Sequence, residues 1–192
     1  MKSTLLCTCV VVLVASACAT TPGGTTKTEK VPGHVAADYF PLKLGTAWEY
    51  EAAMLGEKRV LPVKIVKVFD GLAEDSTGAR LLADAWGVRD ERRYLLRNPI
   101  ENGTKWNNVV SPSSVEGYEI VAVEQPCEAP AGKWEGCVIV ESKNRIDASK
   151  TLVNEMTLAP GVGIVRMATT LEDGGKRLPQ SKLTLLKFTP AP

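Results

Sequence analysis

Turn-forming residues recur at short intervals through most of this chain, and this spacing limits its fold more than any other feature. Gly, Pro, Asn or Asp interrupts the sequence about every 8 to 15 residues, and the segments between are rich in Val, Ile, Leu, Thr and aromatic residues. Short segments of this kind, separated by turn signals, are typical of antiparallel sandwiches and barrels. We therefore predict an all-β domain, built as an antiparallel curved sheet or a half-open barrel.

Helical periodicity is weak, so at most one short helix is expected. The best window is Ala73–Arg93, where Leu81 and Trp86 fall on one helical face. Gly78 and Gly87 interrupt it, and each destabilises a helix by about 1 kcal/mol. The segments with strand character are Trp48–Met54, Lys58–Phe69, Ala79–Trp86, Glu91–Arg97, Glu119–Glu124, Gly136–Lys143, Thr151–Leu158, Gly163–Thr170 and Leu183–Thr189.

One eight-residue pattern occurs twice. The segments Pro41–Trp48 (PLKLGTAW) and Pro99–Trp106 (PIENGTKW) both fit P-x-x-x-G-T-x-W. Glycine at the fifth position permits a turn with positive φ, and the tryptophan places a large apolar ring under the sheet. We predict a duplicated structural element with both tryptophans as core anchors, although four shared residues can also recur by chance.

The N-terminus has the three parts of a secretory signal. Lys2 supplies positive charge, Leu5–Val14 is almost wholly apolar, and the small residues Ala15, Ser16 and Ala17 follow. The apolar run is about 10 residues long, whereas a bilayer-spanning helix needs about 20. We predict that residues 1–17 are a signal peptide that is removed on export.

Cys18, which directly follows the small residues, is the predicted lipidation site. This junction resembles the lipobox of bacterial lipoproteins, although Ala15 stands where leucine is usual. The resemblance implies a lipid anchor with fatty acids such as palmitate on Cys18. Since Ala19 is not Asp, it also implies the periplasmic face of the outer membrane. The alternative is an ordinary signal-peptidase site at the same bond, which would release a soluble protein.

Two regions follow the predicted lipidation site. Residues 18–35 are rich in Thr, Gly, Pro and Lys and have almost nothing to bury, which is typical of a flexible linker. Residues 36–192 are predicted to form a single β-rich periplasmic domain. Removal of residues 1–17 takes away one of the 23 basic residues and none of the 22 acidic residues. The exported chain is therefore formally neutral. A neutral chain argues against a nucleic-acid partner.

Cys127 and Cys137 remain in the exported chain and are predicted to form a disulfide. Their compartment permits disulfides, and the turn-rich sequence between them can bring two strand ends together. The alternative is two free thiols. Redox-active pairs usually have the spacing C-x-x-C, so redox catalysis is not predicted.

We predict no catalytic residue, metal site or cofactor. His34 is the sole histidine and lies in the linker, where neither a catalytic triad nor a zinc site is expected. Asp84 and the run Asp90–Arg93 could form a carboxylate pair, but such runs usually cover a solvated strand edge. The segment Gly161–Gly163 lacks the third glycine of a nucleotide-binding loop, and a hairpin turn is predicted there.

Three stretches resemble a loosely defined group of bacterial secreted lipoproteins of unknown function. Tyr39–Tyr50 (YFPLKLGTAWEY), Ala129–Cys137 (APAGKWEGC) and Ala159–Arg166 (APGVGIVR) are similar to its YFPL-x-x-G-x-x-W-x-Y, PAG-T-F-x-x-C and APGVG-x-V-R patterns. Lys133 and Trp134 replace the usual Thr-Phe. The resemblance covers about a fifth of the residues. It implies a curved sheet or half-open barrel, broadly like periplasmic lipoprotein carriers, and no catalytic residues.

The expected function is binding by a membrane-tethered, non-enzymatic domain. An apolar ligand or lipid would occupy the concave side of the sheet. The alternative is a structural or assembly component of the cell envelope, with a filled core and an exposed apolar patch or edge that binds a protein partner. For the first reading, the expected cavity lining includes Leu61, Val63, Ile65, Val138 and Val140.

Overall fold

The structure is a computed structural model that describes residues 34–112 and 114–192. The signal peptide (1–17), the lipidation site Cys18 and all but the last two residues of the linker (18–35) lie outside the described residues and stay predictions. Within the described ranges, no helix is long and apolar enough to cross a membrane.

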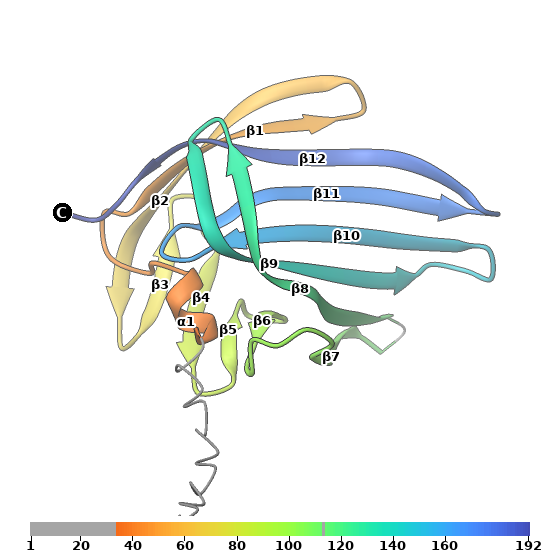
Figure 1. Ribbon diagram of the computed structural model, residues 1–192, viewed down its shortest axis with the longest axis horizontal. Helices are drawn as coiled ribbons and strands as arrows, with labels where there is room; N and C mark the ends of the chain where they lie inside the picture. The colour runs from red at the N-terminus through yellow and green to blue at the C-terminus, as the bar shows by residue number, and fades with distance from the viewer. Residues whose placement is uncertain (1–33, 113) are drawn as a thin grey trace, which may run out of the picture. The chain divides into compact units, whose positions relative to one another are not determined.

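In the part of the chain that the structure describes, twelve antiparallel strands form one curved sheet that nearly closes into a barrel, accompanied by one short helix (Figure 1). The predicted all-β class, with a curved antiparallel sheet and room for one helix, is confirmed. The elements are α1 (Ala36–Tyr39), β1 (Ala47–Met54), β2 (Glu57–Phe69), β3 (Leu72–Asp75), β4 (Arg80–Asp84), β5 (Gly87–Arg89), β6 (Tyr94–Arg97), β7 (Lys105–Ser111), β8 (Ser114–Ala129), β9 (Gly132–Arg145), β10 (Lys150–Ala159), β11 (Gly163–Asp173) and β12 (Lys176–Thr189).

The helix is not in the window that showed the best helical periodicity. Residues 73–93 instead form strands β3, β4 and β5 and their turns, so that alternative was wrong. Gly78 and Gly87 adopt φ values of +86° and +154°, which turn the chain instead of continuing a helix. A Cβ atom on Gly87 would overlap the carbonyl oxygen of Leu96, so the close approach of β5 and β6 requires glycine at this position.

The sheet consists of two meanders of six strands each, β1–β6 and β7–β12. The strand order is β6-β5-β4-β3-β2-β1-β12-β11-β10-β9-β8-β7, so β1 and β12 join the two halves and β6 and β7 are the edges. Each half begins with one copy of P-x-x-x-G-T-x-W, whose last two residues begin β1 in the first copy and β7 in the second. The repeated sequence therefore marks the start of two halves with the same strand connectivity.

The two copies of the motif make the same backbone hydrogen bonds. The amide of Gly45 donates to the carbonyl of Ile65 at 3.0 Å, and the amide of Gly103 donates to the carbonyl of Ile120 at 2.8 Å. Their φ values are +93° and +85°. Both isoleucines are fully buried. The prediction of a duplicated structural element is confirmed.

Both motif tryptophans are core anchors, as predicted. Trp48 and Trp106 are 7% and 5% exposed. The indole of Trp48 donates to the carbonyl of Val162 at 2.6 Å, and that of Trp106 donates to the carbonyl of Tyr94 at 2.9 Å. Each indole N–H therefore has a partner inside the protein, which is how a buried tryptophan avoids an unsatisfied donor.

The halves meet at two seams that differ in kind. At the main-chain seam, every residue of β1 pairs with β12. At the side-chain seam between β6 and β7, the amide of Tyr94 donates to Oδ1 of Asn108 at 3.1 Å. The carbonyl of Tyr94 accepts from Nδ2 of Asn108 at 3.1 Å and from Trp106. Asn108 thus provides the donor and acceptor that a neighbouring strand would normally offer to Tyr94.

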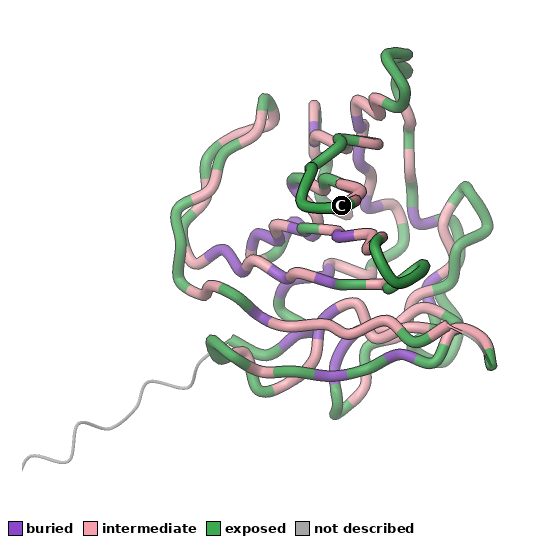
Figure 2. The backbone as a smooth tube through the Cα atoms, turned by 90° about the vertical axis from the view of Figure 1, so that its right-hand side faces the viewer, coloured by how far each residue is buried: buried purple, intermediate pink, exposed green. Residues whose placement is uncertain are grey.

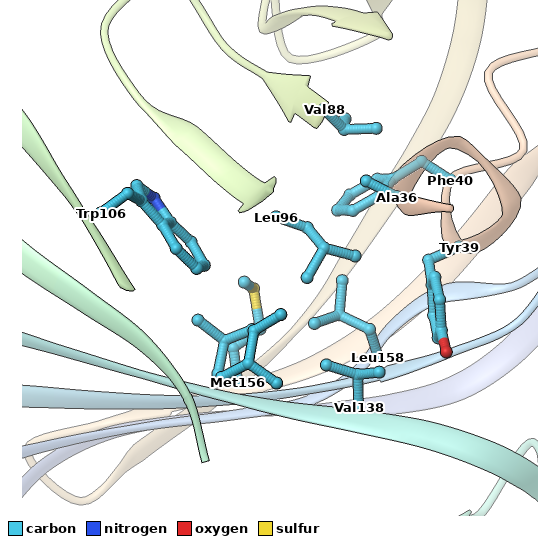
Figure 3. Close-up of a cluster of buried hydrophobic side chains, with 11 residues drawn as sticks. Ala36, Tyr39, Phe40, Val88, Leu96, Trp106, Val138, Met156 and Leu158 are labelled. Carbon is cyan, nitrogen blue, oxygen red and sulfur yellow. The ribbon is translucent and has the colours of Figure 1, made fainter. Parts of the chain in front are cut away.

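The buried residues of β10 and β11 gather near the turn that joins these strands, where Val162 is also buried, whereas residues 150–152 and 169–173 at their opposite ends are half-buried (Figure 2). One core cluster fills the interior beneath α1 (Figure 3). There, Phe40 and Tyr39 from the α1 region approach Leu96 of β6 and the apolar face of β9 and β10. The second cluster is built around Trp48, Tyr50, Ile65, Val165 and Leu185.

Candidate functional site

An interior pocket of about 320 Å³ lies on the face of the sheet that also carries the first core cluster. Val140, Met156 and Met167 are cross-strand neighbours on β9, β10 and β11, so their side chains share this face. The apolar part of the lining is formed by Leu95, Val140, Leu152, Met156 and Met167.

Of the five residues expected to line a cavity, only Val140 lines this pocket. Val138 and Ile65 are almost completely buried within the two core clusters, and Leu61 and Val63 pack against the second cluster. The expected lining was wrong at these four positions. Val138 belongs to the cluster that also contains Tyr39 and Phe40, so the interior near α1 is filled by side chains.

One side of the pocket carries a charged pair and a tyrosine. Nε of Arg93 lies 2.9 Å from Oε2 of Glu116, and the hydroxyl of Tyr118 donates to the same oxygen at 2.9 Å. The Glu116 side chain is only 12% exposed. Burial, followed by the neighbouring Glu116 carboxylate, raises the pKa of Tyr118 to about 12. The pair is therefore internally neutralised, and Tyr118 carries its proton at neutral pH.

Neutral hydrogen-bonding groups complete the polar side. Nδ2 of Asn154 donates to Oγ of Ser142 at 3.3 Å, and the hydroxyl of Thr169 donates to Oδ1 of Asn154 at 2.8 Å. Ser142 and Asn154 both line the pocket. An amide N–H and a hydroxyl can each make further hydrogen bonds, so these groups can bind an uncharged polar ligand.

A larger groove of about 680 Å³ lies on the opposite face of the sheet. Thr157 pairs with Ile139 and Arg166, and all three line this groove. On each strand they are next to a residue that lines the interior pocket, so their side chains point to the opposite face of the sheet. Its other wall is the outer part of the β8–β9 hairpin, including Cys127 and Trp134.

The predicted disulfide is present in this hairpin. Cys127 and Cys137 are joined with an S–S distance of 2.01 Å and a Cα–Cα distance of 6.1 Å. Gln125 pairs with Cys137 and Cys127 pairs with Trp134 across the hairpin, so the bridge ties its two strands together. At the turn of the hairpin, the amide of Ala131 donates to the carbonyl of Leu185 on β12 at 3.3 Å.

The carboxylates considered for acid–base chemistry close their own turns. Oδ1 of Asp84 accepts the amides of Trp86 and Gly87 at 2.8 and 3.1 Å. Oδ1 of Asp90 accepts the amide of Arg93 at 2.6 Å. Burial works to raise the pKa of Asp84, but the combined hydrogen bonds from these amides, Tyr94 and Arg89 lower it below its ordinary value. Both groups therefore have structural roles in the turns.

His34 and the segment Gly161–Gly163, the other residues that the sequence analysis considered, line neither the interior pocket nor the outer groove. Nδ1 of His34 is 3.6 Å from Oδ2 of Asp38, and its imidazole meets the ring of Tyr39 edge-on. Within residues 34–112 and 114–192, no three His, Cys, Asp or Glu side chains are grouped so as to hold a metal ion. The segment around Gly161 is the predicted turn between β10 and β11, and its amide donates to the carbonyl of Asp38 at 2.7 Å.

Sequence reasoning did not identify the polar side of the interior pocket. Arg93 belongs to a charged run that we interpreted as a solvated edge, and Glu116 lies 23 positions further along the chain. The two meet only because the sheet curves until β6 approaches β7 and β8. No local sequence pattern signals such a contact.

Comparison with known proteins assigns no family. No family model matches the chain, and no curated protein matches it. The chain is similar to the crystal structure of a candidate lipoprotein from Parabacteroides distasonis, with 13% identity, a TM-score of 0.44, and coverage of 79% of this chain and 98% of that one. It is also similar to a candidate exported protein with a YmcC-like fold from Bacteroides fragilis, with 14% identity, a TM-score of 0.45, and coverage of 79% and 99%.

Proposed function

We propose that this chain is a lipoprotein whose domain binds one small amphipathic molecule in the interior pocket, without catalysis. The observation that supports this most strongly is the division of the pocket lining. Leu152, Met156 and Met167 contribute to an apolar side, while Ser142 and Asn154 contribute neutral hydrogen-bonding groups. Ligand sites typically combine a mainly apolar lining with a few placed polar groups.

The size and charge of the pocket narrow the class of ligand. Its volume of about 320 Å³ is near the lower end of the roughly 300–1,000 Å³ usual for ligand pockets. A short apolar chain therefore fits better than a complete phospholipid. Because Arg93 and Glu116 neutralise each other, a neutral polar head group is matched better than an anionic one.

In this proposal, the domain is held at the periplasmic face of the outer membrane by lipid on Cys18. The support comes from the N-terminal sequence, in which a signal-like segment of 17 residues ends in small residues before that cysteine. We expect Cys18→Ser to move the protein from the membrane fraction to the soluble fraction. A Cys18→Ser protein that stays in the membrane fraction would contradict the anchor.

The ligand class can be tested by titrating the soluble Cys18→Ser chain with a medium-chain monoacylglycerol and with the fatty acid of equal chain length. The monoacylglycerol should bind more tightly. Glu116→Gln removes the negative partner of Arg93, so it should shift the preference toward the fatty acid anion. Tighter binding of the fatty acid by the unsubstituted pocket would contradict the proposed neutral head group.

A matched pair of tryptophan substitutions tests the location. Leu152→Trp adds volume to the interior pocket and should abolish monoacylglycerol binding. Ala168→Trp adds the same ring to the outer groove and should leave binding unchanged. If only Ala168→Trp blocked binding, the ligand site would be the outer groove.

A protein partner from the cell envelope is the second candidate. It is favoured by the outer groove, where the cations Arg166 and Lys182 lie beside Glu155 and the half-buried ring of Trp134. Such a mixture of an aromatic ring and charges is common at protein interfaces. Crosslinking in whole cells from a photoreactive residue at position 168 should then capture one protein, and Trp134→Ala should abolish that capture.

A further inference from the structure

Three chain segments of the first meander lie along one edge. Successive strands alternate in direction, so the β2–β3 turn, the β4–β5 turn and the end of β6 fall on the same side (Figure 1). Leu72 pairs with Leu82, which places the first two turns next to each other. The amide of Asn98 donates to the carbonyl of Trp86 at 2.9 Å and brings the end of β6 beside them.

This edge exposes large apolar side chains. Phe69 is 73% exposed, Trp86 is 64% exposed and Leu72 is 38% exposed. Phe69 and Leu72 are cross-strand partners on either side of the β2–β3 turn. We call these three residues the aromatic edge. Two exposed aromatic rings on adjacent turns leave considerable apolar surface in water.

Trp86 and the neighbouring Arg97 are residue types that suit the interface of a membrane with water. The guanidinium of Arg97 lies 5.9 Å from the centre of the Trp86 ring. Tryptophan is enriched where the acyl region of a bilayer meets its head groups, and arginine can keep its charge in the head-group layer. Asp70 lies in the β2–β3 turn and Asp84 ends β4 beside the β4–β5 turn, so attraction to anionic lipid is not the basis of the contact.

The chain that leads to Cys18 enters the domain at this edge. The described residues begin at His34, and the amide of Ala36 donates to Oδ1 of Asn98 at 2.8 Å. Val35, which precedes α1, is 47% exposed. Fifteen residues, 19–33, separate Cys18 from His34, and a fully extended chain spans at most about 3.5 Å per residue. A lipid on Cys18 therefore keeps this edge within a few tens of ångströms of the membrane.

We propose that the aromatic edge inserts into the boundary between head groups and acyl chains of the membrane that anchors Cys18. The inference rests on the tether in the proposed function, and it adds a protein surface that touches the bilayer. The lipid and the edge then bind the same membrane, so the edge acts at a high effective concentration. The contact also fixes the orientation of the domain on the bilayer.

The test uses the exported protein, lipidated on Cys18, in vesicles of phosphatidylethanolamine and phosphatidylglycerol, with and without phospholipid that is brominated on its acyl chains. Bromine quenches tryptophan fluorescence on contact. The chain has four tryptophans, so we expect a loss of up to about a quarter of the emission. Trp86→Phe should remove the quenched component, whereas Trp134→Phe, in the outer groove, should retain it.

A second matched pair tests the neighbouring turn. Phe69→Ser should reduce the quenching of Trp86, because it removes the adjacent apolar side chain. Leu55→Ser should not, because Leu55 is 82% exposed at the β1–β2 turn, at the other end of β2. Vesicle-bound protein whose Trp86 is quenched by iodide in water but not by brominated lipid would overturn the edge proposal and leave the tether intact. Protein that does not remain with the vesicles would overturn both.

Discussion

The main-chain seam and the side-chain seam join equivalent strands in different ways. β12 ends the second half and pairs with the whole length of β1, while β6 ends the first half and reaches β7 through Trp106 and Asn108. Strand length explains the difference, because β3 to β6 have three to five residues each and β9 to β12 have 10 to 14. The duplicated motif sets how each half begins, but not how far its strands extend.

The interior pocket lies beside the weaker of the two seams. Arg93 and Leu95 flank Tyr94, whose main chain forms the side-chain seam, and both line the pocket. From the other edge, Glu116 and Tyr118 line it, and Tyr118 stacks on Trp106 with ring centres 5.3 Å apart. The seam that lacks strand pairing is thus the one that brings polar groups to the cavity.

The largest effects are expected at the motif tryptophans, and they test whether the two copies are equivalent. Trp48→Ala and Trp106→Ala should each lower the free energy of unfolding by about 3–5 kcal/mol, because each leaves a large cavity. Trp86→Ala, at an exposed ring, should change it by about 0.5 kcal/mol or less. Urea unfolding measures all three. Should either motif variant behave like Trp86→Ala, the equivalence of the copies would be wrong.

The next effect is confined to the side-chain seam. Asn108→Ala leaves the amide of Tyr94 without its partner and should destabilise the protein by about 1–3 kcal/mol. Hydrogen exchange at the Tyr94 amide should accelerate, while amides of β1 keep their rates. Asn107→Ala, on the exposed side of the same strand, is the control. An unchanged exchange rate at Tyr94 would show that the seam does not depend on Asn108.

A smaller effect separates the two motif threonines. The hydroxyl of Thr104 donates to the carbonyl of Pro99 at 3.0 Å, so Thr104→Val should destabilise by about 1 kcal/mol. The buried hydroxyl of Thr46 has no hydrogen-bond partner among the described residues, so Thr46→Val should be neutral or stabilising. Thermal unfolding of the two variants measures this difference, and equal losses would contradict it.

The last difference is expected as the pH rises above 10. Tyr118 has its pKa raised from 10.0 to about 12, and burial also raises the pKa of Tyr50 above its ordinary value. The unfolded chain loses these protons first, so stability should be complete below pH 10 and should fall as pH rises toward 12. Unfolding measured across this range should decline less steeply in Tyr118→Phe and in Tyr50→Phe. Equal slopes in all three proteins would contradict the burial of these hydroxyls.

Much of the fold could be predicted from the sequence because its turns carry local signals. The pairs Leu55-Gly56, Asp70-Gly71 and Asn102-Gly103, which lie between the segments with strand character, all form turns. Each of the nine predicted strands overlaps an observed strand, whereas β3, β5 and β7 were missed. β3 and β5 are too short to show alternation. β7 could have been found, because it begins at the end of the second motif as β1 begins at the end of the first.

The candidate site could be predicted only in part. Cys127 and Cys137 stand close together in the sequence, so their pairing across a hairpin was accessible. The interior pocket depends on contacts between distant strands, such as Arg93 with Glu116, and on α1 filling one end of the interior. Such features arise from the curvature of the whole sheet, which no single segment encodes.

Native mass spectrometry of the protein purified from its own membranes tests the central claim most directly. The proposed pocket predicts one neutral amphipathic molecule per chain, retained in Ala168→Trp and absent from Leu152→Trp. If the wild-type chain carried no such molecule, or if Leu152→Trp retained it, the interior pocket would not be the binding site.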